Sequence, residues 1–391
     1  MDATATAGFL RFFRDVPDPR TGNFITHRLH DLIVIAVLAV ICGADGWVQV
    51  ALWGRCKAKW LATFLDLPGG GGIPSHDTFA RVFAMLDPDR FERCFLSWMA
   101  AVVELSAGRL VSIDGKAIRR SFEHAWDKSG MTSLLSAFLS QGDNRLVFTQ
   151  LAIEDKSNEI VAIPKLLDLL DLRGAVVTID AIGCQREIAS KVTTGGADYV
   201  LPVKENQPTL LDKTRLLLND VVLDHAKGLG DPAHVGYVEQ SESGHGRRET
   251  RRVWVSDEVQ CLGKELLAQW PGLSSVALVE RTRQDLGDLT GNVSVERQIY
   301  ISSVKGVDAR AIATAVRGHW SVENNLHWQL DVSFGEDQNR TRSGNGAENY
   351  SRLCRIALNL LKRDASIKAG IKTKRLNAGW DHDYLLRLIS Q

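Results

Sequence analysis

The 391-residue sequence lacks several features that would assign it quickly to a class of protein. Its six cysteines lie far apart without a CxxC pair, which excludes the spacings of a structural zinc site and of a secreted disulfide framework. We therefore expect reduced thiols and a cytoplasmic protein. The longest apolar run, residues 32–42, is about half of a bilayer span, so no membrane contact is expected. No basic-then-apolar leader opens the chain, which argues against secretion.

An excess of charge of one sign is also lacking, with 47 Lys and Arg against 47 Asp and Glu. This balance argues mildly against a nucleic-acid partner, although phosphate affinity depends on local patches. One such patch is residues 339–375, where ten basic residues face two acids, a local net charge of +8 that predicts a surface for a polyphosphate partner. The basic residues are Arg340, Arg342, Arg352, Arg355, Lys362, Arg363, Lys368, Lys372, Lys374 and Arg375. A second patch contains His245, Arg247, Arg248, Arg251 and Arg252.

The composition, 45% hydrophobic and 24% charged, is that of an ordinary globular chain long enough for two or three domains. Residues 1–107 read as a helical domain, with a mostly buried helix in residues 30–53 that breaks at Gly43–Gly46, and a capped helix start at Ser75. This domain is either an accessory bundle or a module that binds a DNA end through Arg81, Arg90 and Arg93.

Strand-like and helical segments alternate after residue 108. Strands are expected at residues 110–114, 133–139, 146–153, 175–180 and 198–203, with a hairpin turn at Gly142–Asn144 and helices at 159–170 and 185–193. This order predicts an α/β fold with a mixed sheet over residues 108–206. Residues 207–306 open with a helix at 209–218, continue with strands at 250–255, 275–281 and 295–304, and read as a β-rich insertion. Residues 307–391 are again expected to be mainly helical.

Two of the expected strands end in an acid, Asp114 and Asp180, and ligands bind at such strand ends in open α/β sheets. A third acid, Glu323, lies in residues 317–337, which we expect to form one amphipathic α-helix. In it His319, Glu323 and His327 form a polar column at a spacing of four residues. Trp320, Leu326 and Leu330 would bury another side of this helix. Two or three carboxylates are enough to hold a pair of Mg²⁺ ions for phosphodiester cleavage.

Each of these residues also has a simpler interpretation. The two aspartates could be ordinary turn acids, and the histidines could stack in the core. Asp331, Glu336 and Asp337 lie close enough in sequence to replace Glu323 as a ligand. A zinc hydrolase is excluded, because the histidine spacing is not that of a His-Glu-x-x-His helix.

Taken together, these residues resemble a DDE transposase of the H-repeat-associated (ISAs-type) bacterial insertion-sequence family. The resemblance covers nearly the whole chain and rests on an ordered set of short motifs. They are Asp18–Arg20, Ser112–Lys116, Glu154–Glu159, Thr178–Ala181, Gly244–Arg247, His319–Trp320, Glu323–Asn324, Leu326–Trp328, Leu330–Val332, Glu336–Asp337 and Ala357–Lys362.

The resemblance implies an RNase H-like catalytic core interrupted by the insertion, with Asp114, Asp180 and Glu323 as catalytic metal ligands. It further implies two Mg²⁺ ions, which Mn²⁺ can replace, for cleavage of double-stranded DNA at terminal inverted repeats and transfer to target DNA. The expected setting is the bacterial cytoplasm at the nucleoid, with a homodimer on DNA. The expected DNA contacts are Lys116, Lys204, His245, Arg247, Arg248, Arg317, His319, Arg340 and Arg342. A catalytically silent DNA-binding remnant and a stand-alone nuclease are the alternatives.

The sequence departs from the broader superfamily around Glu323. That superfamily places Tyr, Arg and Lys around the catalytic Glu, where this chain has Val316, His319 and Leu330. His319 could take over a phosphate contact. Residues 204–207 read Lys-Glu-Asn-Gln instead of the usual Lys-Gly-Asn-Gln, which adds an acid near an expected DNA contact.

Overall fold

The computed structural model describes residues 8–22, 25–103, 109–118, 121, 132–139, 145–153, 158–244, 246–286 and 292–390. The turn expected at residues 142–144 and the expected contact His245 lie outside the described residues. The chain divides into two compact units. The first comprises Met1–Glu104, Gly115–Asn158 and Val322–Gln391, and the second comprises Leu105–Asp114 and Glu159–Ser321.

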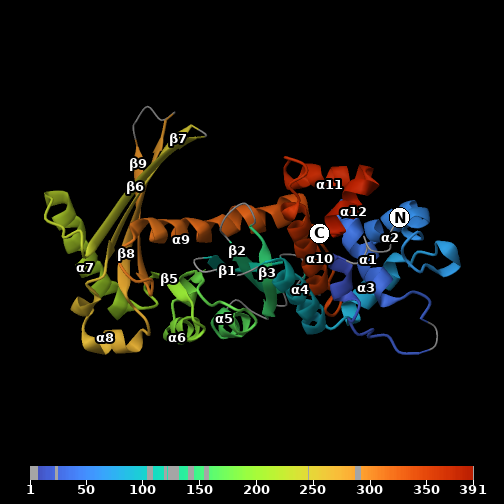
Figure 1. The fold of residues 1–391 in the computed structure, drawn as a ribbon, viewed down its shortest axis with the longest axis horizontal. Coiled ribbons are helices and arrows are strands. Elements are labelled where there is room, and N and C mark those ends of the chain that lie inside the picture. Colours follow the sequence, from blue (N-terminus) through green and yellow to red (C-terminus); the bar gives the residue numbers. More distant parts are fainter. Residues whose placement is uncertain are drawn as a thin grey trace, which may run out of the picture. The chain divides into compact units, whose positions relative to one another are not determined.

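The core of the first unit is built around an apolar helix, α1 (Leu29–Ile41), in which every residue except His30 is buried. Helix α10 (Gly346–Arg363) packs against it (Figure 1). Because α1 is apolar all round, it must be covered on every side, and helices from both ends of the chain supply that cover. The other helices of this unit are α2 (Trp47–Leu61), α3 (His76–Met85), α4 (Pro88–Val102), α11 (Ile371–Trp380) and α12 (His382–Ile389).

The helix boundaries in this region follow the signals in the sequence. Helix α1 ends just before Gly43 and α2 begins just after Gly46, so the predicted break is confirmed. The Ser75 hydroxyl accepts a hydrogen bond from the Thr78 amide at 3.2 Å, which is the expected cap of α3. Among the described residues, no helix combines the length and the apolar character needed to cross a membrane.

Nine strands of the described residues form one mixed sheet in the order β3-β2-β1-β4-β5-β9-β8-β7-β6. Strand β1 (Leu110–Ala117) contributes to both units, because the boundary between them follows Asp114. Strands β2 (Ser133–Leu139) and β3 (Val147–Ile153) form an antiparallel pair in the first unit. The predicted α/β fold with a mixed sheet, flanking helices, a β-rich insertion and a helical N-terminal region is confirmed.

In the second unit the sheet changes from parallel to antiparallel pairing. Strands β1, β4 and β5 pair in parallel, and β5 then pairs with β9 in antiparallel fashion, so the β-rich residues extend the same sheet. Strand β6 was not predicted, because its residues are mainly polar and exposed. The strands are β4 (Val176–Ile179), β5 (Asp198–Val203), β6 (Val235–Gly244), β7 (Arg247–Ser256), β8 (Ser275–Asp285) and β9 (Val293–Ser302).

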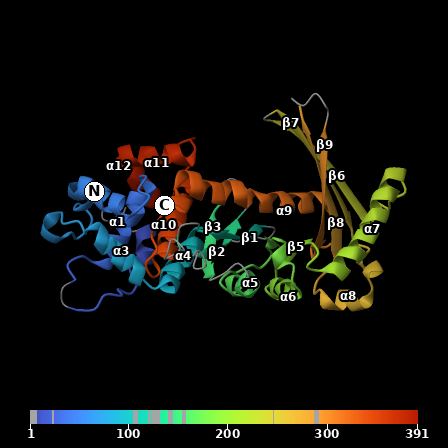
Figure 2. The same ribbon diagram turned by 180° about the vertical axis from the view of Figure 1, so that it is seen from behind.

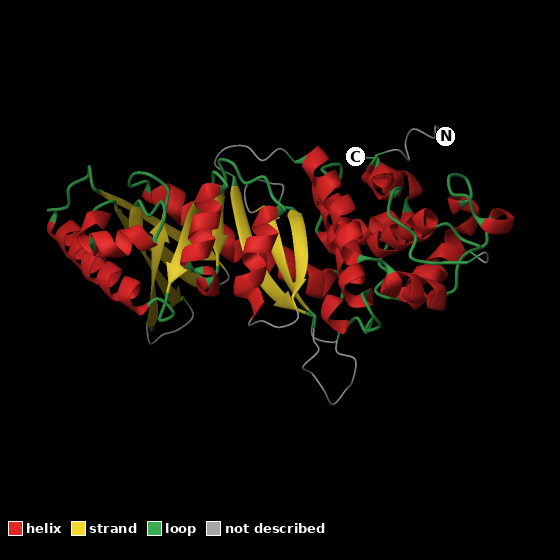
Figure 3. Ribbon diagram, turned by 90° about the horizontal axis from the view of Figure 1, so that it is seen from below, coloured by secondary structure: helices red, strands yellow, loops and turns green. Residues whose placement is uncertain are grey.

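Helices cover both sides of the sheet in the second unit. Figures 1 and 2 show α5 and α6 on one side of β5 and α9 on the other, and the view from below in Figure 3 shows helices in front of the strands. The helices are α5 (Glu159–Asp168), α6 (Arg186–Thr194), α7 (Pro208–Lys227), α8 (Lys264–Gln269) and α9 (Ala309–Val322).

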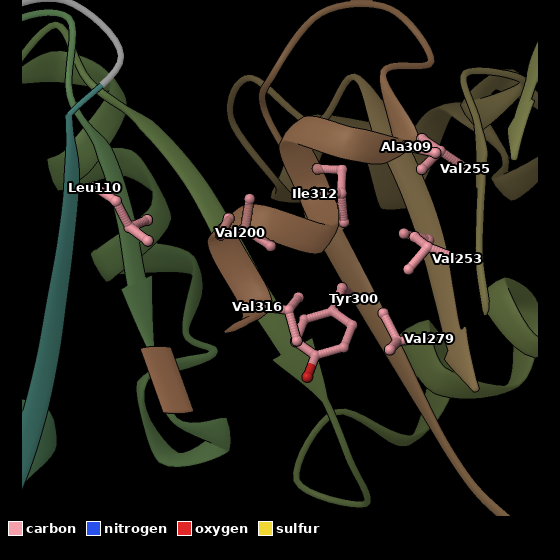
Figure 4. Packing of buried hydrophobic residues seen from close by; sticks show 11 residues of the cluster. Leu110, Val200, Val253, Val255, Val279, Tyr300, Ala309, Ile312 and Val316 are labelled. Carbon is pink, nitrogen blue, oxygen red and sulfur yellow. The ribbon is translucent and has the colours of Figure 1, made fainter. Parts of the chain in front are cut away.

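Helix α9 is fixed by a hydrophobic cluster at the centre of the second unit. Its residues Ala309, Ile312 and Val316, spaced three and four apart, face the sheet (Figure 4). Val279 and Tyr300 are among the strand residues that they meet. This packing sets the direction in which the helix runs toward residue 323.

Candidate active site

Asp114 and Asp180 lie side by side on neighbouring parallel strands of the second unit. The register pairs Ile113 of β1 with Ile179, the last residue of β4, so Asp114 in β1 and Asp180 directly after β4 both follow this paired position. One residue earlier, the hydroxyls of Thr178 and Ser112 are joined by a 2.9 Å hydrogen bond that ties the two strands together. The prediction that Asp114 ends its strand is wrong, because β1 continues to Ala117.

A tight turn fixes the side chain of Asp180. A single 3₁₀ turn, Ala181–Gly183, follows β4 directly, and the Asp180 carboxylate accepts a hydrogen bond from the Gly183 amide at 3.4 Å. Gly183 itself is buried against Ile179. The carboxylate is therefore held by the backbone of its own turn rather than by a distant partner.

His319 of α9 lies near Asp180 within the same unit. Burial lowers the pKa of His319, and the Asp180 carboxylate acts in the opposite direction. The Nδ1 atom of His319 is buried and has no hydrogen-bond partner among the described residues. The imidazole is thus largely neutral at pH 7, and it brings a nitrogen donor toward the aspartate pair.

The segment that follows α9 differs from the single α-helix that we expected. Residues Glu323–His327 and Gln329–Ser333 are π-helical, and the Trp328 amide donates to the carbonyl of Glu323, five residues back. A π-helical turn holds more residues than an α-helical turn, so the column of His319, Glu323 and His327 expected from α-helical spacing does not continue unchanged. Such turns are rare and are frequent at functional sites.

Within the first unit, the π-helical turn brings Glu323 and His327 together. A carboxylate oxygen of Glu323 and an imidazole nitrogen of His327 lie within 4.8 Å of each other. Leu326 and Leu330 are fully buried and anchor the segment, as expected.

Trp320 was expected to be buried, but it is 52% exposed, and the Arg281 guanidinium lies over its ring at 5.6 Å.

Lys116 was expected to contact DNA, but its charge is balanced inside the first unit. Its ammonium donates to Asp331 and, at 2.9 Å, to Glu336. Arg355 of α10 reaches the same Glu336 at 2.7 Å, and the Ser351 hydroxyl also donates to it. Two of the acids that could have replaced Glu323 as a ligand are therefore engaged by cations.

The surroundings of Glu336 stabilise its charge strongly. Burial favours the neutral acid, but the Arg355 and Lys116 cations outweigh it and lower the pKa of Glu336 to about 2. Asp331 behaves differently, since burial raises its pKa although Lys116 acts in the opposite direction. The network therefore holds one fixed negative charge between the half-buried Lys116 and the buried Arg355.

The basic residues in 339–375 do not form one surface patch, and this prediction is wrong for four of the ten. Four of these cations are buried and form ion pairs within the first unit. The pairs are Arg352 with Glu92 and Glu348, Arg355 with Glu336, Lys374 with Asp364, and Arg375 with Asp45. A local charge count cannot distinguish these residues from exposed ones, because their acidic partners can lie more than 200 positions away in the sequence.

The other expected DNA contacts differ in how free their charges are. Lys204, Arg247, Arg248 and Arg340 are exposed, and Arg342 is half-buried. Arg317 of α9 instead makes two hydrogen bonds to Glu242 of β6, one of them at 2.9 Å. The Arg317 guanidinium thus donates to two carboxylate oxygens, as it could otherwise donate to two oxygens of a phosphate.

A transposase DDE domain model matches residues 106–360, which contain both aspartates and Glu323. The chain belongs to the DDE transposase family. A second model, described as DDE_Tnp_1-associated, matches residues 10–99, the helical N-terminal region. The observed mixed sheet with flanking helices agrees with the RNase H-like fold expected for this family.

Curated relatives of this DDE transposase chain match three quarters to nearly all of its length. "Putative transposase YncI" of Escherichia coli O157:H7 is 38% identical over 383 residues, which are 97% of this chain and 94% of that protein. "H repeat-associated putative transposase YhhI" of Escherichia coli K12 is 36% identical over 96% of both chains. An "Uncharacterized protein in dhlA 3'region" of Xanthobacter autotrophicus is 43% identical over 75% of this chain and 93% of that protein.

The donor atoms of these residues fit a divalent metal. Carboxylate oxygens such as those of Asp114, Asp180 and Glu323 are the hard ligands that Mg²⁺ and Mn²⁺ prefer, whereas the imidazole of His327 suits other first-row metals better. The six cysteines, all free, add no thiolate to this set. His327 was not predicted as a ligand, because α-helical spacing placed it only in a polar column with His319 and Glu323.

Proposed function

We propose that this chain is a DNA transposase that cuts at the ends of an insertion sequence and joins them to target DNA. Asp114, Asp180 and Glu323 are the proposed metal ligands, and two Mg²⁺ ions, replaceable by Mn²⁺, are the proposed cofactors. The observation that carries the proposal is the pair of aspartates at the same level of two neighbouring parallel strands. Glu323 joins them in the proposal because it lies in the part of the chain that the transposase DDE domain model matches, and because its neighbours His319–Trp320 and Asn324 belong to the ordered set of family motifs.

The protein's own residues would act by position and charge. The sheet and the Gly183 turn hold the two aspartates rigidly, so little reorganisation is needed when a phosphate arrives. When bound, divalent ions would neutralise the phosphate and activate the attacking water or 3′-hydroxyl. His319, neutral at pH 7, would offer a nitrogen to the phosphate or its attacking water in place of the superfamily's arginine.

We infer that double-stranded DNA, as the element's terminal inverted repeats and as the target, is bound by several regions of the chain. Residues 1–107 would hold an element end through the exposed Arg81, Arg90 and Arg93. Residues 108–206 and 307–391 would form the catalytic core, and residues 207–306 would add contacts near the start of β7. A homodimer on DNA, located at the nucleoid in the cytoplasm, would pair the two ends.

Replacement of Asp114 by alanine tests the chemistry. Labelled duplexes of the DNA that flanks the coding sequence serve as substrates, with Mg²⁺ or Mn²⁺. We expect wild-type protein to cleave and join these duplexes, and Asp114→Ala to bind them equally well in a gel shift without cleavage. Asp171→Ala, which alters an exposed ion pair with Arg173 far from the site, is the matched control and should cleave normally.

The same assay separates the alternatives. Cleavage that persists in Asp114→Ala would overturn the ligand assignment. Binding by the wild type without cleavage in either metal would identify a catalytically silent remnant. Nicked products without joined products would identify a stand-alone nuclease of the same fold.

A further inference from the structure

Lys362 lies one residue before the end of α10 and has unusual contacts for a lysine in that position. A lysine in the last turn of a helix ordinarily extends into solvent, where it favours the helix dipole. Lys362 instead turns inward in the first unit. Its ammonium lies 4.9 Å from the centre of the Phe138 ring on β2.

The ammonium of Lys362 joins two segments that are distant in sequence. It donates a hydrogen bond to the carbonyl of Arg145 at 2.6 Å, just before β3, and another to the carbonyl of Asn325 at 2.8 Å. Neither acceptor is a carboxylate, so the contact is not an ordinary ion pair. Burial, together with the charge of Arg145, lowers the pKa of Lys362 to about 7. Burial of this charged amine reduces the stability of the fold, so we expect the contact to have a structural or functional role.

Asn325 is the centre of the π-helical turn Glu323–His327. In that turn the Glu323 carbonyl accepts a hydrogen bond from the amide of Trp328, five residues on, instead of a residue four positions on. A turn of this kind is rare, so a contact from outside the turn can help to hold it in this geometry. Lys362 supplies a donor at the middle residue, with Glu323 two positions before it and His327 two positions after it.

We propose that Lys362 is a positioning residue that holds the π-helical turn in the geometry that brings Glu323 and His327 together for metal binding. This inference rests on the proposed function, because it assumes that Glu323 binds the divalent ion. Lys362 touches neither the metal ligands nor substrate, so it acts through the Asn325 carbonyl. It is comparable to the outer groups that orient metal ligands in other sites, whose loss costs metal affinity.

Direct measurement of Mn²⁺ binding tests this proposal without using cleavage. Free Mn²⁺ is followed by electron paramagnetic resonance as it is titrated into the full-length protein. We expect Lys362→Met and Lys362→Gln to weaken the Glu323-dependent binding by about 10-fold or more. Glutamine keeps an amide donor, but it is too short to reach both carbonyls, so it provides a milder variant if the methionine variant does not fold.

Two controls separate positioning from general stability. Lys368→Met removes an exposed lysine from the same region and should leave Mn²⁺ affinity unchanged. Leu358→Ala creates a cavity beneath α10 and should lower the melting temperature, while the folded protein binds Mn²⁺ normally. Circular dichroism melts of all variants report whether each one is folded.

The outcomes distinguish this inference from the proposed function. Wild-type affinity in folded Lys362→Gln, or a loss no larger than that in Leu358→Ala, would overturn the positioning role alone. If wild-type protein and Glu323→Gln bind Mn²⁺ equally, Glu323 is not a ligand, and the proposed function fails before Lys362 is considered.

Discussion

Gly183 ends the turn after β4, and it has no room for a side chain. A Cβ atom at Gly183 would lie 2.2 Å from Cγ2 of Ile179, well inside van der Waals contact. We expect Gly183→Ala to destabilise the protein by about 1–3 kcal/mol, and to move the Asp180 carboxylate, which accepts a hydrogen bond from the Gly183 amide. Urea denaturation measures the first effect, and Mn²⁺ binding measures the second.

Gly370 provides the matched control for this substitution. It precedes α11, and an added Cβ would meet no atom within 4 Å. Gly370→Ala should therefore unfold at nearly the wild-type urea concentration. Equal stability of the two variants would mean that the turn can relax and does not fix Asp180.

The stability of the first unit depends on the negative charge of Glu336. Glu336→Gln would leave the half-buried Lys116 and the buried Arg355 without their shared anion, and breaking a buried pair such as Arg355 and Glu336 costs about 3–5 kcal/mol. The control is Glu296→Gln, which removes an exposed partner of Arg281 and should change the free energy of unfolding little. A small effect of Glu336→Gln in urea denaturation at pH 7 would contradict this role.

The pKa of Glu336 also predicts how stability changes with pH. The folded pKa of about 2 lies below the ordinary value of 4.5, so the unfolded chain binds protons more readily. The stabilisation from this carboxylate is therefore complete above about pH 4.5 and is lost as pH falls toward 2. Urea denaturation between pH 6 and 3 should show a steeper loss for wild type than for Glu336→Gln.

At the level of elements, the contact between β6 and α9 affects DNA binding. Glu242 of β6 occupies the Arg317 guanidinium of α9, although both side chains are 51% exposed. An exposed pair contributes little stability, so Glu242→Gln should melt like wild type. The freed arginine and the lost negative charge should increase the affinity for an element end. They should also make that affinity fall more steeply as the salt concentration rises.

Gel-shift titrations at several salt concentrations measure this effect. Glu296→Gln changes the net charge by the same amount without releasing Arg317, so it controls for the charge alone. Equal affinities in the two variants would mean that only net charge matters and that Arg317 does not reach DNA.

The elements that could be predicted are those whose signals are local. Strands β2 and β5 begin and end where they were predicted, because alternating or continuous apolar residues are bounded by turn residues. Strand β6 was missed, since its polar residues gain their order only by pairing with β7. The π-helical turns have no local signal at all, and they coincide with a contact from Lys362 37 positions away in sequence.

On the scale of the whole molecule, the candidate site could likewise be predicted only where the signals are local in the sequence. The placement of Asp114 and Asp180 could be predicted, because each follows an apolar run that forms a strand and these two strands pair in parallel, but their role as ligands stays a prediction. The two acids that bind Lys116 could not be predicted, since they are 215 and 220 positions away and nothing near Lys116 in the sequence suggests them. Charges that look alike in a sequence divide into structural and exposed groups only after the chain has folded.

The order of the three proposed ligands along the chain has a consequence for synthesis. Asp114 and Asp180 leave the ribosome early, whereas Glu323 follows Asp180 by 143 positions, after all of β6 to β9. The apolar helix α1 is also made early, but it stays without part of its cover until α10 and α11 have been made. A product that stops before residue 323 would therefore lack both the third proposed ligand and the helices that bury α1, so we expect it to fold poorly and to be degraded.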